Sequence, residues 1–171
     1  MKKTITAILL ATAFASAFAA PQEVASPGFA KARQQFDAAA AGDTSARDAA
    51  IEAFQGLAAA QPGHPLLMAY EGAATAMKGR DATMPWEKMK YAEKGANMIE
   101  KALQLLGPEH DEALFNGTPE SIEIRLVAAN TLLALPDFMN RRTGGRRAVD
   151  AALASPAFAK APAPVRAALY A

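Results

Sequence analysis

Residue types that often carry protein chemistry are scarce in this 171-residue sequence, which has no cysteine, two histidines and one tryptophan. Without cysteine the chain can form no disulfide, offers no thiolate and has no lipobox residue for lipid attachment. The two histidines, His64 and His110, do not stand at the spacing of a closed zinc motif. We therefore expect no metal site.

Motifs of common catalytic and cofactor sites are missing as well. No serine stands in a G-x-S-x-G turn or beside a histidine, and neither a P-loop nor a dinucleotide fingerprint is present. Methionine thioethers can hold copper(I), but the methionines form no M-x-x-M cluster, so we expect them to fill gaps in the core. The sequence predicts a protein that is not an enzyme and holds no cofactor.

Alanine supplies much of what the sequence does contain. Hydrophobic residues make up 51% of the chain, charged residues 20% and aromatics 7%. Alanine is the strongest helix former, and its short side chain lets helices approach closely. This balance, together with few β-branched residues, predicts one all-α domain rather than a disordered chain.

The N-terminus has the layout of a secretory signal peptide. Two lysines precede an apolar run from Ile5, and small residues follow at Ala17 and Ala19. We expect cleavage after Ala19, which leaves residues 20–171 as one domain in the periplasm. The apolar run is shorter than the ~20 residues that span a bilayer, so we expect no stable membrane span after cleavage.

The charge balance does not support nucleic-acid binding. The full chain has 18 Lys and Arg residues against 17 Asp and Glu residues. Removal of the two signal-peptide lysines leaves a nearly neutral protein, without the basic excess that nucleic-acid binding requires.

A pattern of small and apolar residues followed by a proline occurs three times along the chain. Its members are Ala50, Phe54, Leu57 and Pro62, then Gly95, Ile99, Ala102 and Pro108, then Gly144, Ala148, Ala151 and Pro156. The first three members of each set share one helical face, and the proline stops the helix. A recurrence of roughly 45 to 50 residues lies in the range of helical solenoids.

Each of these helices has a predicted partner before it in the sequence. The partners cover approximately residues 28–41, 65–79 and 119–135, and prolines at positions 65 and 119 fit a first helical turn. The connection within the second pair, RDATMPWEKMKY, is predicted to be a long loop. Three stacked antiparallel helix pairs follow from this pattern.

This pattern resembles the tetratricopeptide repeat, whose second helix carries small residues at the crossing point, an aromatic residue and a terminal proline. The stretches that carry the resemblance are HPLLMAYEGAATAMKGRD, PWEKMKYAEKGANMIEKAL and IRLVAANTLLALPDFMNRR. They are similar to a group of exported bacterial tetratricopeptide-like proteins. The resemblance implies an all-α solenoid of about three antiparallel helix pairs after a signal peptide, and a concave face that binds a protein or peptide.

Candidate binding residues on the first helices are Tyr70, Arg125 and Asn130. Arg125 stands among apolar neighbours in IEIRLVAAN. A charge in such a setting is either paired or presented to a ligand. We favour pairing, with Glu71 or Glu100 as the partner.

The predicted long loop offers another candidate, because it contains Trp86 and Lys90. An exposed aromatic residue beside lysines makes a good anchor for a protein partner. The alternative, which we favour, is that Trp86 folds under the loop and packs helix against helix.

A turn rich in arginine and glycine precedes the last patterned helix. Its arginines, which flank Gly144 and Gly145, are Arg141, Arg142, Arg146 and Arg147. Arginines at a helix N-terminus favour an anion. The favoured alternative is a solvated turn whose arginines pair with Glu120, Glu123 and Asp150.

The function predicted from these patterns is a non-catalytic interaction or scaffold module in the periplasm, with a protein or peptide partner in the cell envelope. The alternative function is a periplasmic binder of a small anionic ligand through the turn at residues 141–147. The sequence carries no signal for an oligomeric state.

Overall fold

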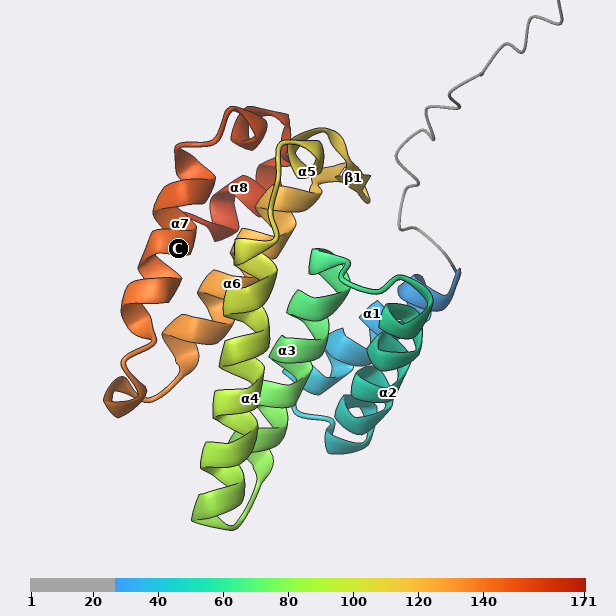
Figure 1. Cartoon of the computed structure of the whole chain (residues 1–171), viewed down its shortest axis with the longest axis vertical. Helices are drawn as coiled ribbons and strands as arrows, with labels where there is room; N and C mark the ends of the chain where they lie inside the picture. The colour runs from blue at the N-terminus through green and yellow to red at the C-terminus, as the bar shows by residue number, and fades with distance from the viewer. Residues whose placement is uncertain (1–26) are drawn as a thin grey trace, which may run out of the picture.

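Helix pairs follow one another along the chain in the computed structural model, which describes residues 27–171 (Figure 1). The pairs are α1 (Pro27–Ala40) with α2 (Thr44–Ala60), α3 (Pro65–Asp81) with α4 (Pro85–Gln104), and α6 (Glu120–Ala134) with α7 (Arg142–Leu153). The all-α prediction is confirmed for the described residues. The predicted signal peptide, residues 1–19, lies outside them.

Short elements fill the connections between the long helices. They are α5 (Glu109–Glu112), β1 (Leu114–Phe115), β2 (Thr118–Pro119), η1 (Asp137–Met139), η2 (Pro156–Lys160) and α8 (Ala163–Ala168). The two strands pair antiparallel between α4 and α6. Beyond α7, Ala157, Ala161 and Leu169 pack with Ile122 of α6 in a second small core. The segment after α7, which includes the short helix α8, therefore covers part of α6.

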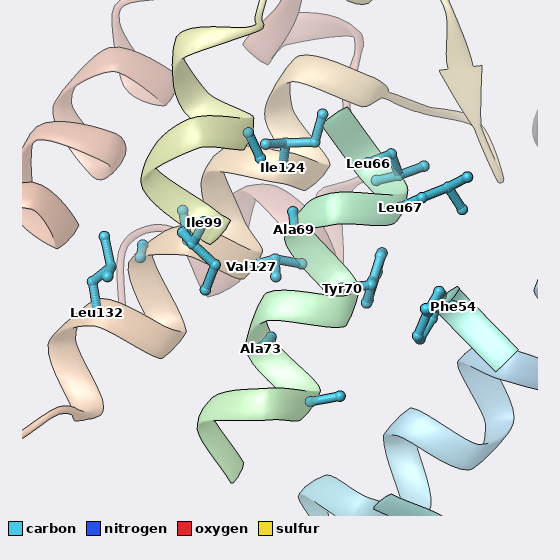
Figure 2. Packing of buried hydrophobic residues seen from close by; sticks show 14 of the residues in the cluster. Phe54, Leu66, Leu67, Ala69, Tyr70, Ala73, Ile99, Ile124, Val127 and Leu132 are labelled. Atoms are coloured by element: carbon cyan, nitrogen blue, oxygen red, sulfur yellow. The ribbon is translucent and has the colours of Figure 1, made fainter. Parts of the chain in front are cut away.

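Helix α3 lies at the centre of the structure and contacts α1, α2, α4 and α6. Its buried residues occur on almost every side of the helix, so it has no broad polar face. Figure 2 shows Tyr70 directed toward Phe54 of α2, whereas Ile99 of α4 and Val127 of α6 lie on the other side of α3. The main core is therefore built around this one helix.

The helix starts follow from local chemistry. The Asp43 carboxylate accepts hydrogen bonds from the backbone N–H groups of Ser45 (2.9 Å) and Ala46 (3.1 Å), which caps α2. Pro65 and Pro85 occupy the first turns of α3 and α4, where a missing N–H costs no hydrogen bond.

A pair of glycines lets α3 and α4 cross at close range. A Cβ atom on Gly95 would lie 2.5 Å from the backbone oxygen of Gly72, and one on Gly72 would lie 2.9 Å from the oxygen of Gly95. Both positions therefore require the absence of a side chain. This contact explains the small residue that the sequence pattern places at position 95.

Two predicted features are wrong in detail. The connection between α3 and α4 is short, because α3 continues to Asp81 and α4 begins at Pro85. The buried face of α7 contains Gly145 and Ala152 rather than the predicted Gly144 and Ala151. Gly145 faces α6 so closely that a Cβ atom there would lie 2.7 Å from the Leu133 side chain.

We predict that Gly95→Ala lowers the free energy of unfolding by about 2 to 3 kcal/mol, because the added methyl group meets backbone across the crossing. Gly56→Ala is the matched control, since nothing lies within 4 Å of its added Cβ in the exposed interior of α2. It should raise stability by about 1 kcal/mol through helix propensity. Urea unfolding measures both values, and equal effects of the two substitutions would contradict the close crossing.

Candidate functional site

The sequence-predicted binding residues separate into different surface regions, one of which is a groove formed by α3, α4 and the end of α2. We call it the outer groove, and its volume is about 1030 Å³. Its lining residues are Ala58, Gly63, His64, Met68, Glu71, Trp86, Met89, Lys90, Glu93, Lys94, Asn97, Met98 and Lys101. Two of the predicted residues, Trp86 and Lys90, therefore lie in one site.

Trp86 stands at the start of α4 with 68% of its surface exposed. The prediction that Trp86 packs beneath a loop is wrong. The residues expected to form that loop are the first turn of helix α4, and Trp86 belongs to this turn. Lys90 follows one helical turn later and lies over the ring of Tyr91, with its nitrogen 5.6 Å from the ring centroid. The Trp86 indole is thus available to a partner.

The outer groove combines methionines with a row of lysines. Met68, Met89 and Met98 are half-buried in its walls. Lys94 and Lys101 continue the row that begins with Lys90 along α4, and neither forms an ion pair with any residue from 27 to 171. A flexible apolar surface beside free ammonium groups suits an extended partner with apolar and acidic residues.

A second groove lies between α1, α3 and α6, the first helices of the three pairs. We call it the inner groove, and its volume is about 320 Å³. It is lined by Arg33, Phe36, Ala40, Tyr70, Ala73, Ala76, Met77, Arg80, Glu123, Leu126, Val127, Asn130, Thr131, Ala134 and Leu135. The predicted residues Tyr70 and Asn130 both belong to this groove, but Tyr70 is only 1% exposed.

A buried polar network closes one end of the inner groove. The Tyr70 hydroxyl donates a hydrogen bond to the Glu123 carboxylate, and Arg33 donates to the Tyr70 oxygen. Arg33 also donates to Glu123 over 3.1 Å. Burial, followed by the nearby Glu123 charge, raises the pKa of Tyr70 far above its usual range, so the hydroxyl remains a donor.

Aromatic rings surround Tyr70 on the core side. Phe54 stacks on it with ring centroids 5.2 Å apart, and Phe36 meets it edge-on at 5.0 Å. Tyr70, which the sequence predicts as a ligand contact, therefore joins three helices instead. It lines the inner groove but is almost fully buried.

A third region, which we call the arginine pocket, lies between α4, α6 and α7. Its volume is about 450 Å³, and it is lined by Glu100, Leu103, Gln104, Leu106, Arg125, Gly144, Arg147, Ala148 and Ala151. The expected pairing of Arg125 with Glu71 or Glu100 is wrong, because its ion-pair partner is Asp111, with Nη1 and Oδ1 3.9 Å apart. Burial lowers the pKa of Arg125, and the Asp111 charge opposes this shift.

The predicted turn at residues 141–147 is wrong, because α7 begins at Arg142 and so includes residues 142–147, and their arginines do not converge on one point. Arg141 donates to Glu100 over 2.6 Å and to Asn97 over 2.9 Å, whereas Arg142 pairs with Asp137. These partners differ from the acidic residues predicted from the sequence. Arg146 is exposed and forms no ion pair within the described part of the chain, and Arg147 alone of the four lines the arginine pocket.

Both histidines lie near the buried carboxylate of Glu120, which the sequence predicted as a partner of the arginines at 141–147. His64 Nε2 is 3.8 Å from the Glu120 carboxylate, which is almost fully buried. Burial raises the pKa of Glu120 and lowers that of His64, and the His110 charge acts in the same direction on His64. No three His, Asp or Glu residues in the described range are grouped so as to hold a metal ion.

The comparisons with known proteins returned no match: no protein-family model, curated protein or solved structure is significantly similar to this chain. Within residues 27–171, no helix combines the length and apolar character needed to cross a membrane.

We predict that Tyr70→Phe lowers the free energy of unfolding by about 1 to 3 kcal/mol, because it removes the hydroxyl donor from the buried Glu123 carboxylate. Tyr91→Phe is the matched control, since the Tyr91 hydroxyl forms no hydrogen bond with the described residues, and its effect should stay within about 0.5 kcal/mol. Urea unfolding of both variants decides the matter, and a Tyr70→Phe variant as stable as the parent would refute the network.

We also predict that Glu120→Gln stabilises the protein at neutral pH. The buried carboxyl has a pKa above its usual 4.5, so the native state loses stability as the pH rises from 4.5 through the folded pKa. Glu120→Gln has no carboxyl to titrate and does not lose stability in this way. The difference in the free energy of unfolding between this variant and the parent should therefore vanish below pH 4.5. Unfolding measured across this pH range tests the sign; a variant that is less stable at neutral pH would show that Glu120 gains more from His64 than it loses by burial.

Proposed function

We propose that this protein is a non-catalytic, tetratricopeptide-like interaction module of the periplasm, and that the outer groove binds a protein or peptide of the cell envelope. The observation that carries the proposal is Trp86, exposed over 68% of its surface at the mouth of a large groove. Tryptophan is enriched among the residues that dominate binding energy at protein interfaces.

The stacking of the helices supports the tetratricopeptide-like part of the proposal. The second helix of each pair packs on the first helix of the next pair, α2 on α3 and α4 on α6. The first helices also contact each other, α1 with α3 and α3 with α6. Figure 1 displays the pairs in chain order across the molecule. A helical solenoid is built by this kind of neighbour-to-neighbour contact.

Rigidity of the outer groove favours binding. Its walls are helices, and α3 and α4 are held in close register by the contact between Gly72 and Gly95. A partner would therefore find the surface formed in advance and would lose little of its binding energy to ordering of this chain. Methionine side chains add local adaptability on that fixed backbone.

The chemistry of the outer groove indicates the kind of segment that fits. Trp86, Lys90 and Lys94 lie on one face of α4, since they are four residues apart. A segment with an apolar side chain against Trp86 and acidic side chains further along α4 would match this row. Glu71 and Glu93 in the same groove would disfavour a segment with many carboxylates, so we expect only a moderately acidic partner.

Anion binding by residues 141–147, at the start of α7, has less support as a function. Two of its arginines, Arg141 and Arg142, already pair with the carboxylates of Glu100 and Asp137. An anion that binds there would have to displace these carboxylates, which costs free energy. A ligand of the outer groove does not have to break these ion pairs.

We predict that Trp86→Ala abolishes capture of a specific envelope protein by the purified, immobilised protein, with at least a tenfold loss of affinity. Phe138→Ala is the matched control, because Phe138 is 67% exposed on η1 but lies outside the outer groove. The control should retain the partner fully.

Trp86 also provides a direct readout, because it is the single tryptophan of the chain. Addition of the captured partner should shift its fluorescence to shorter wavelength as the indole leaves water. Binding that leaves the Trp86 emission unchanged, or a partner lost equally in both variants, would contradict the outer groove as the binding surface.

A further inference from the structure

The arginine pocket holds a guanidinium that forms no direct hydrogen bond with any of residues 27–171. The side chain of Arg125 is 19% exposed, and its Nη1 atom is buried without a hydrogen-bond partner. The closest carboxylate oxygen, on Asp111, lies 3.9 Å away and already accepts a hydrogen bond from Ser121. Because a partly buried charge normally has hydrogen-bond partners, this arginine is available to an additional anion.

A second cation lines the same pocket from the opposite element. Arg147 of α7 is exposed, and it has no ion pair within the described residues. Glu100 also lines the pocket, but its carboxylate is held by Arg141 at 2.6 Å. The pocket therefore contains two guanidinium groups beside Glu100, a carboxylate that already pairs with Arg141. Arg125 has a single distant ion-pair partner, Asp111, and Arg147 has none among the described residues.

The remaining wall of the pocket is mostly apolar, with Gln104 as its one polar side chain. Leu103 and Leu106 contribute from the end of α4 and the loop after it, and Ala148 and Ala151 contribute from α7. Its volume of about 450 Å³ falls within the range of small-molecule sites. A ligand with a charged head and a short apolar tail would satisfy both halves of this surface.

We propose that the arginine pocket binds a small organic carboxylate, with the carboxylate between Arg125 and Arg147 and the apolar part against Leu103 and Leu106. Planar guanidinium groups match the geometry of a carboxylate through paired N–H donors. Asp111, which pairs with Arg125, reduces the positive charge available to a ligand and so favours a singly charged ligand over a phosphate dianion. This site is separate from the outer groove and uses none of its residues.

The test is calorimetric titration of the purified protein with butyrate, acetate and inorganic phosphate at matched ionic strength. Butyrate should bind, and acetate, which lacks two methylene groups, should bind roughly tenfold more weakly. Arg125→Met and Arg147→Met should each weaken butyrate binding at least tenfold. Arg146→Met is the matched control, because Arg146 has the same charge on the same helix but lies outside the pocket, and it should bind butyrate like the parent.

Folding of the variants does not obscure the result. Methionine fills a similar space, and Asp111, which loses its ion-pair partner, is 35% exposed and keeps the hydrogen bond from Ser121, so Arg125→Met should unfold at a denaturant concentration close to that of the parent. The proposal is overturned if butyrate does not bind, if all three methionine variants bind it equally, or if phosphate binds more tightly than butyrate and is lost with Arg125. The Trp86 fluorescence response to a protein partner does not depend on these variants, so the two proposals fail separately.

Discussion

The hydroxyl group of Tyr70 sets the constraint on which the rest of the structure depends. It lies in the interior of a helical protein, where an unpaired polar group is costly. Arg33 of α1 and Glu123 of α6 supply its partners, and Tyr70 itself belongs to α3. One buried network therefore joins the first helices of all three pairs, and the aromatic rings around Tyr70 fill the space that these helices enclose.

Different kinds of contact hold the two sides of α3. On the side of α1 and α2 the packing is aromatic, with Phe29 and Phe54 against Tyr70. On the side of α4 the contact is backbone to backbone, through Gly72 and Gly95. The close crossing fixes the position of α4 relative to α3 and the end of α2, which together form the outer groove. The proposed binding surface is thus a consequence of how α3 is packed, and the exposed Trp86 is placed at its mouth by the helix start at Pro85.

Much of the fold could be predicted from the sequence, because small residues and prolines at helical spacing depend on local chemistry. The three helix pairs, the close approach at Gly95 and the helix starts at prolines have this origin. The site was harder to predict, because its chemistry depends on contacts between distant segments. No local pattern shows that Tyr70 meets Glu123, that Arg125 and Arg147 line one pocket, or that His64 lies near Glu120. The expected packing of Trp86 beneath a long connection is wrong, because α3 ends at Asp81 and α4 begins at Pro85, which leaves too short a loop to cover the indole.

The most direct test of the central claim, that the outer groove binds a protein partner, is photo-crosslinking in living cells. A photoreactive phenylalanine derivative replaces Trp86 in one strain and Phe138 in another, since both positions are exposed aromatics on the same protein. The account predicts a discrete crosslinked protein adduct from position 86 and none from position 138. An adduct from position 138 alone, or none from position 86, would contradict it.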